Sequence, residues 1–67
     1  MAQVDGITIK VGDSVSFKSD TEQYGIVTKI MGNKLTLKSP WDEGFQGSYI
    51  GGSDSTVVHV DECWMED

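Results

Sequence analysis

Residues 11–39 limit the possible folds more than any other part of the chain, because apolar and polar residues alternate there between turn-forming residues. Val15 and Phe17 alternate with polar residues, which predicts a short strand with one buried face. The Gly32-Asn33 pair predicts a two-residue hairpin turn, since both residues tolerate positive φ. The segment therefore indicates short antiparallel strands joined by tight turns, and an all-β fold.

The same pattern predicts strands on both sides of this segment. We expect strands at residues 7–11, 14–18, 24–31, 34–38 and 56–60, then a turn at 61–63 and a brief strand at 63–65. In the first strand, Ile7, Ile9 and Val11 are expected to share one face. Residues 19–23 are polar and predict a loop. Gly25 suggests a bulge or strong bend in the third strand.

Residues 39–55 interrupt the alternation with the only proline, four glycines and three aromatic residues. A loop of this length is unusual in a small domain, and long ordered loops are often functional. The pattern also permits a short strand at residues 47–50 inside the loop.

Size and composition set further limits. The 67 residues suffice for one domain, so we expect residues 1–67 to form a single unit with a shallow working surface. Cys63 is the only cysteine, which excludes an internal disulfide and fits a reducing compartment. No signal peptide or membrane-spanning run of apolar residues is present, and we expect a cytoplasmic protein.

Three short segments carry a resemblance to a known family. They are VGDSV at residues 11–15, GIV at residues 25–27 and VHVDE at residues 58–62. Together with the strand order they resemble SH3-like barrels of the KOW and Tudor kind. The resemblance implies a small SH3-like barrel of about five antiparallel strands with one long loop, residues 39–55, and a closing valine strand that runs into a single 3₁₀ turn. Such barrels bind RNA, methylated peptides, proline-rich peptides or large enzyme complexes.

The short, acidic, single-domain form is also similar to accessory proteins of bacteriophages. That similarity implies a location in the cytoplasm of a bacterial host.

The charge distribution divides the chain. All five basic residues are lysines that precede residue 40, whereas residues 41–67 carry seven acids and no base, within a net charge of −6. Arginine, the favoured residue for phosphate and base contacts, is absent. The negative charge predicts either a partner with a basic surface or a purely solubilising role.

Several aromatic residues accompany the acids in the second half of the chain. An aromatic group flanked by carboxylates can hold a cationic side chain by cation–π attraction and charge pairing. The alternative is that the loop folds back and its aromatic rings complete a small core. The predicted partner-binding face consists of Trp41, Asp42, Glu43, Phe45, Tyr49, Asp61, Glu62 and Trp64. We therefore expect a non-enzymatic protein-binding module, as a monomer or as a homodimer formed through edge strands.

The alternative function is a KOW-like nucleic-acid-binding barrel. Its basic surface would use four lysines at outward strand positions, namely Lys18, Lys29, Lys34 and Lys38. Exposed lysines on strands also protect sheet edges from aggregation, which is the other interpretation of these residues.

Catalytic, metal and cofactor sites are not expected. His59 and Cys63 are the only imidazole and thiol, and acids around Cys63 would disfavour a thiolate nucleophile. Two Cys or His ligands are too few for a structural zinc site within one chain. Residues 51–53 (GGS) lack the lysine and helix that phosphate-binding loops require.

Overall fold

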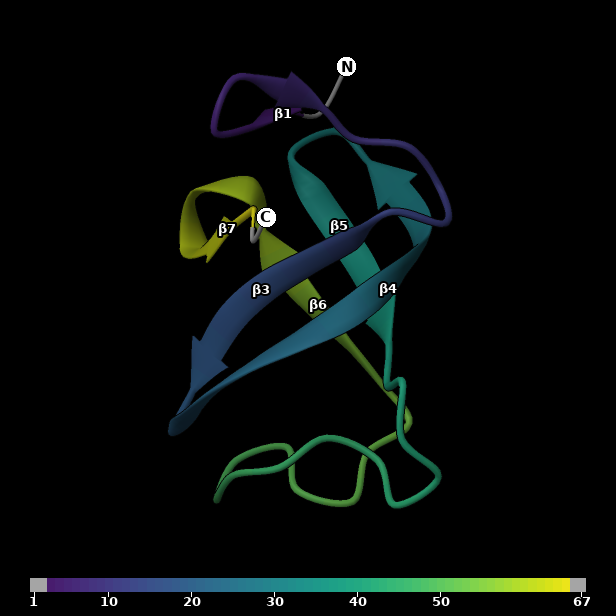
Figure 1. Cartoon of the computed structure of the whole chain (residues 1–67), viewed down its shortest axis with the longest axis vertical. Coiled ribbons are helices and arrows are strands. Elements are labelled where there is room, and N and C mark those ends of the chain that lie inside the picture. Colours follow the sequence, from purple (N-terminus) through teal and green to yellow (C-terminus); the bar gives the residue numbers. More distant parts are fainter. Residues whose placement is uncertain (1–2, 66–67) are drawn as a thin grey trace.

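The computed structural model describes residues 3–65. Its elements are β1 (Gln3–Val4), β2 (Ile7–Thr8), β3 (Ser14–Ser19), β4 (Thr21–Met31), β5 (Lys34–Lys38), β6 (Ser55–His59), the 3₁₀ turn η1 (Val60–Glu62) and β7 (Cys63–Trp64). Five strands form one antiparallel sheet in the order β6-β5-β4-β3-β7, and β1 pairs with β2 in a separate hairpin (Figure 1). The predicted all-β fold of five antiparallel strands with one long loop is confirmed.

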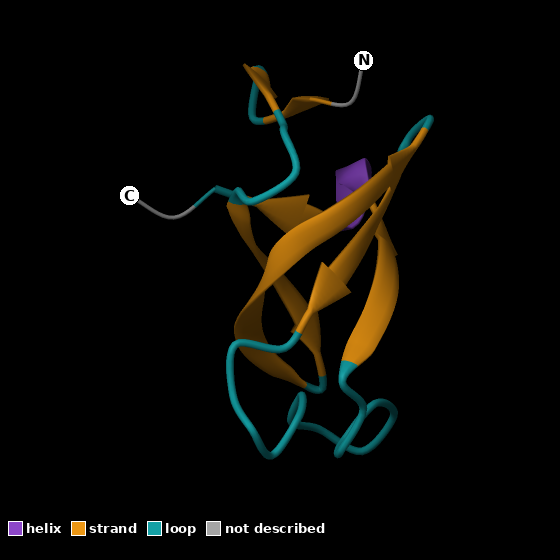
Figure 2. Ribbon diagram, turned by 90° about the vertical axis from the view of Figure 1, so that its right-hand side faces the viewer, coloured by secondary structure: helices purple, strands orange, loops and turns teal. Residues whose placement is uncertain are grey.

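The two edges of this sheet, β6 and β7, are close in sequence. Only the three residues of η1 connect them, so the sheet curls until its two edges approach the same region. Figure 2 shows the strands wrapped around a common interior, with the β1–β2 hairpin at one end and the long loop at the other. Within the described residues, hydrogen bonds do not join β6 to another edge, so the predicted barrel is a curled open sheet.

The turn between β3 and β4 corrects the loop predicted at residues 19–23. Asp20 alone reverses the chain, with φ of 70°, and β4 begins at Thr21. Aspartate tolerates this left-handed conformation better than most residues. Three of the polar residues that predicted a loop lie instead on β4, where Glu22 is exposed, Thr21 is half-buried and Gln23 is buried.

Strand β4 contains the predicted irregularity, but two residues beyond Gly25. The register with β5 shifts between Val27 and Lys29, where a bulge interrupts the ladder. Gly25 is needed for packing, since a Cβ at this position would lie 2.8 Å from Leu37 Cβ and 3.0 Å from a ring carbon of Phe45. The sequence therefore singled out Gly25 correctly, but the reason is close packing against Leu37 of β5 and Phe45 of the loop, and not a bulge.

The hairpin predicted at Gly32 and Asn33 is confirmed. Met31 pairs with Lys34 across the two-residue turn, and Gly32 takes φ of 60°. The following strand, β5, alternates as expected, with its two leucines fully buried and its lysines exposed.

The strand predicted at residues 7–11 is formed only at Ile7–Thr8, as β2, and the expected shared face of Ile7, Ile9 and Val11 is wrong. Only Ile9 is buried, whereas Ile7 and Val11 are exposed. The chain turns after Ile9, because the Lys10 N–H donates to the Asp13 carboxylate at 2.9 Å and the Asp13 N–H donates to the Lys10 carbonyl at 3.0 Å. Local hydrogen bonds of an aspartate outweigh the alternating pattern here.

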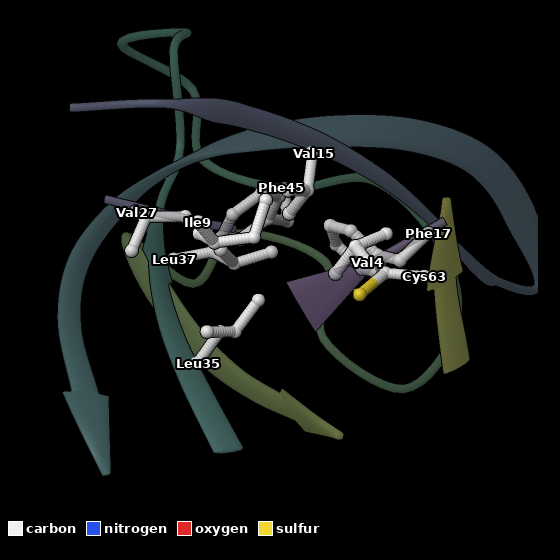
Figure 3. Packing of buried hydrophobic residues seen from close by; sticks show 9 residues of the cluster. All are labelled: Val4, Ile9, Val15, Phe17, Val27, Leu35, Leu37, Phe45 and Cys63. Carbon is white, nitrogen blue, oxygen red and sulfur yellow. The ribbon is translucent and has the colours of Figure 1, made fainter. Parts of the chain in front are cut away.

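The core lies inside the curled sheet (Figure 3). Its buried residues are Val4, Ile9, Val15, Phe17, Val27, Leu35, Leu37, Phe45 and Cys63. Phe17 from β3 and Phe45 from the long loop meet edge to face, with ring centroids 5.4 Å apart. The loop therefore contributes the largest fully buried side chain of the core.

The predicted turn and brief final strand are confirmed as η1 and β7. The Asp61 N–H donates to His59 Nδ1 at 3.2 Å, and the His59 N–H donates to the Glu62 carboxylate at 3.1 Å. This reciprocal capping box starts η1 immediately after β6. Strand β7 then pairs with β3, with Cys63 opposite Phe17 in the core and Trp64 opposite Ser16.

No helix among residues 3–65 is long and apolar enough to cross a membrane.

Candidate partner-binding face

The long loop, residues 39–55, is an ordered part of the fold. Phe45 is only 2% exposed, and its N–H and C=O bond to Ser53 and Gly52, each at 2.8 Å. The Ser39 N–H closes the base of the loop by donating to the Asp54 carbonyl at 2.8 Å. The strand considered at residues 47–50 is not formed, and turns occupy those positions.

Gln23 ties the loop to strand β4. Its side-chain amide donates to the Gln46 carbonyl and accepts from the Gln46 N–H, both at 2.8 Å. Gln23 is itself buried, so one polar side chain substitutes for the strand partner that this part of the loop lacks.

Asp20 makes the second tie, from the β3–β4 turn. Its carboxylate accepts from the Ser48 hydroxyl at 2.7 Å and from the Ser48 N–H at 3.2 Å. The hydroxyl hydrogen bond, followed by the backbone one, lowers the pKa of Asp20 below its ordinary value. The loop is therefore held against one end of the sheet at two separate points.

Three aromatic side chains, Trp41, Tyr24 and Trp64, form an aromatic row across the outer side of β7, β3, β4 and the loop. Trp64 and Tyr24 both stand opposite Ser16, on its two neighbouring strands. Tyr24 meets Trp41 edge to face, with ring centroids 5.3 Å apart. Tyr24 remains 41% exposed, so the row is accessible to a partner.

A shallow groove of about 210 Å³ lies within this row. It is lined by Ser16, Glu22, Gln23, Tyr24 and Trp64. Ser16 is buried between the two rings, and Glu22 is exposed at the side of the groove. The groove thus combines two aromatic rings with a solvent-accessible carboxylate, which is suited to a cationic side chain.

Two further acids extend this surface into the loop. Asp42 and Glu43 follow Trp41 directly and are both exposed. The nearest base in the strand register is Lys18, which stands opposite Glu22. No lysine forms an ion pair within 4.0 Å among residues 3–65.

The structure brings only part of the predicted face together. Trp41, Asp42, Glu43 and Trp64 belong to the surface that contains the aromatic row. Including Phe45 was wrong, because its ring lies in the core. The alternative that the aromatic rings of the loop complete the core is correct for Phe45 and partly correct for Trp41, which packs against the core. Tyr49 is 85% exposed on the loop, next to the Ser48 tie.

Asp61 and Glu62 lie elsewhere. Both belong to η1, which Figure 1 shows beside β7 and above the long loop. Asp61 lies 3.4 Å from His59 Nδ1, and Glu62 caps the turn. Asp61 and Glu62 therefore contact groups of the η1 turn, whereas Asp42 and Glu43 lie beside the aromatic row.

Sequence reasoning missed Tyr24, Glu22 and Ser16 as members of this surface. The available signal was the period-two spacing of Glu22 and Tyr24, which becomes visible once the strand is started at Thr21. Placing residues 19–23 in a loop concealed it.

The four lysines of the alternative nucleic-acid face separate into two groups. Lys29, Lys34 and Lys38 lie on the exposed side of β4 and β5. Lys18 lies on β3 beside Glu22 instead. A basic surface on this molecule therefore contains three of the predicted residues.

Cys63 and His59 do not form a nucleophile–base pair. The thiol donates to the backbone carbonyls of Val60 and His59, at 3.5 and 3.6 Å, while the imidazole caps η1. Burial, and then the negative charges of Asp5 and the η1 acids, raise the pKa of Cys63 and keep the thiol protonated.

Within residues 3–65, no three His, Cys, Asp or Glu side chains gather closely enough to hold a metal ion.

Comparison with protein-family models, with curated proteins and with solved structures finds no match to this chain.

Proposed function

We propose that this chain is a non-enzymatic protein-binding module that holds a basic segment of a partner protein against its aromatic row. The groove between Tyr24 and Trp64, with Glu22 at its side, is the observation that carries the proposal. A lysine or arginine placed there contacts the ring faces and pairs with the carboxylate. A role as a small accessory or regulatory factor is consistent with a surface that binds without a deep pocket.

The net charge of −6 supports the same kind of partner. Long-range attraction accelerates association with a basic surface, and salt weakens it. Asp42 and Glu43 extend the attraction beyond the groove, and Trp41 supplies a ring that Tyr24 already orders. The aromatic row provides the close contacts, while the loop acids provide the steering.

A pull-down from a cell lysate, run with and without nuclease, tests this proposal. We expect a protein to remain bound after nuclease and to leave as salt is raised. Glu22→Lys and Tyr24→Ser should each weaken its binding about tenfold, because each removes one contact of the groove. The double variant Gln3→Lys/Val11→Lys is the matched control, since it makes the same charge change at two exposed positions away from the groove. If the control weakened partner binding equally, binding would depend on net charge alone and not on a specific face.

A second candidate function is nucleic-acid binding through Lys29, Lys34 and Lys38, which share one side of β4–β5. For a single strand that contacts three lysines, log K should fall with log salt at a slope of about −2. Lys→Glu changes at these positions would remove the affinity. No binding to RNA or DNA at low ionic strength would eliminate this candidate.

The relationship to SH3-like barrels of the KOW and Tudor kind, and to phage accessory proteins, stays a prediction. A curled antiparallel sheet with a 3₁₀ turn before its last strand supports the former.

A further inference from the structure

Strand β6 is an edge of the sheet, and its backbone hydrogen bonds identify which groups face outward. The Val60 N–H donates to the Asn33 carbonyl at 2.9 Å, on the side of β5. At the other end of the strand, the Asp54 carbonyl accepts from the Ser39 N–H. In an antiparallel ladder every second residue bonds to the neighbour, so the even-numbered residues of this segment face β5.

The odd-numbered residues therefore direct their N–H and C=O groups away from the sheet. The His59 N–H is already occupied by the Glu62 carboxylate at 3.1 Å, which agrees with this assignment. Ser55 and Val57 retain outward N–H and C=O groups with no described strand beside them. Glu62 thus closes one end of the edge and leaves the rest open.

This open edge lacks the features that usually protect sheet edges. Residues 55–59 contain no lysine, proline or glycine, and their register with β5 runs without a bulge. The Val57 side chain is 59% exposed. A regular, uncharged edge strand is a template for a further strand.

A slot of about 140 Å³ lies beside this edge, between β6 and the end of β3. Its lining includes Phe17 of β3, Thr56 and Val58 of β6, and Glu62 of η1. Strand β7 covers β3 only as far as Phe17, which leaves the slot between the two strands. The inward-facing residues of an added strand would point toward this slot, next to Thr56 and Val58.

We propose that the outer edge of β6 is a second binding site, which accepts an extended segment of a partner protein by strand addition. The segment pairs with Ser55 and Val57 and places one apolar side chain in the slot. Acids lie at both ends of the edge, Asp54 at one and Asp61 with Glu62 at the other. A segment with basic residues at its ends complements them.

A second copy of this chain complements the edge less well. Antiparallel pairing about Val57 would place Asp54 of each copy near Asp61 of the other, between molecules that each carry a net charge of −6. The site therefore favours a partner strand over self-association.

A proline scan tests the backbone assignment. Val57→Pro removes an outward N–H, so the variant should fold, with its denaturation midpoint close to that of Val57→Thr. Thr56→Pro removes an N–H that bonds to β5, so it should unfold at a much lower denaturant concentration. The opposite order of stabilities would overturn the assignment and the proposal.

Binding is tested with a synthetic peptide, acetyl-Lys-Thr-Val-Thr-Val-Thr-Lys-amide, by NMR titration. We expect slower hydrogen exchange at the Ser55 and Val57 amides, and about tenfold weaker binding to Val57→Pro than to Val57→Thr. When threonine pairs with Val57, the threonine N–H groups face β6 and the valine side chains face the slot. N-methylation of the threonines should therefore abolish binding, and N-methylation of the valines should not.

This site is independent of the aromatic row, and the two are separable. Tyr24→Ser should leave the peptide affinity unchanged at β6. Absence of peptide binding to the wild-type chain, or equal binding to Val57→Pro, would overturn the proposal. Concentration-dependent dimerisation that Val57→Pro abolishes would also overturn it, in favour of a second copy as the occupant.

Discussion

At the scale of single residues, the contact between Gly25 and Phe45 decides how the loop meets the sheet. The ring of Phe45 rests where a Cβ of residue 25 would project, close to Leu37. The glycine leaves space for the ring, and the ring fills the space left by the missing side chain. Neither residue is explained without the other.

Gly25→Ala is therefore expected to destabilise the fold by about 1–3 kcal/mol through overpacking. Phe45→Leu also costs stability, but it removes the ring contact with the added methyl group and leaves only the contact with Leu37 Cβ at 2.8 Å, so the double variant should lose less stability than the sum of the two single variants. Urea unfolding of the two single variants and the double variant measures the coupling. Additive free energies would show that residues 25 and 45 do not compete for the same space.

The Asp20–Ser48 contact gives the fold a pH dependence at this same scale. Because the folded-state pKa of Asp20 is lowered, its stabilising contribution is present above the ordinary value of 3.8 and is lost as pH falls through the folded-state pKa. In Ser48→Ala the pKa of Asp20 should rise toward 3.8, which an NMR titration of the carboxyl resonance measures. An unchanged pKa would mean that the hydroxyl does not hold the carboxylate in solution.

At the scale of elements, the loop of residues 39–55 behaves as a seventeen-residue insertion that is fastened to β4 by one side chain. Gln23→Ala leaves the N–H and C=O of Gln46 without partners and should cost about 1–3 kcal/mol. Amides of the loop should exchange faster while those of β5 remain protected. Glu22→Ala, one residue away but exposed, should change stability by no more than about 0.5 kcal/mol.

The elements that sequence reasoning predicted are those with local causes. The Gly32 turn and the alternation around Leu35 are encoded within a few residues, so the β4–β5 hairpin was predictable. The docking of the loop was not, because it depends on Gln23 and Gly25, which are distant from the loop in sequence. The aromatic row was missed for the related reason that Tyr24 gains its role from Trp41 and Trp64.

At the scale of the whole molecule, Cys63 reports on the integrity of the curled sheet. Its thiol is buried between β7 and the core, and its raised pKa reduces the thiolate fraction. Reaction with a disulfide reagent at pH 8 should therefore be at least about tenfold slower than in urea-unfolded protein. Equal rates would mean that β7 detaches readily from β3.

The same thiol makes the stability of the fold depend on pH in the alkaline range. Since the folded-state pKa lies above the ordinary value of 9.0, the contribution of the neutral thiol is complete below that pH and is lost as pH rises through the folded-state pKa. Cys63→Ala should remove this part of the alkaline destabilisation, which thermal unfolding measured from pH 8 to pH 11 would show.

The pairing of β3 with β7 has a consequence for the order of folding. Phe17 pairs with Cys63, and Ser16 pairs with Trp64, although β4, β5, the long loop and β6 separate these residues in the sequence. Closing so long a loop of chain is slow, whereas the β4–β5 hairpin needs only a local turn. Trp41 and Trp64 mark the two late events, arrival of the loop and arrival of the last strand. Stopped-flow fluorescence of single-tryptophan variants would therefore follow each event separately. We expect the change in Trp64 fluorescence to be the slower of the two.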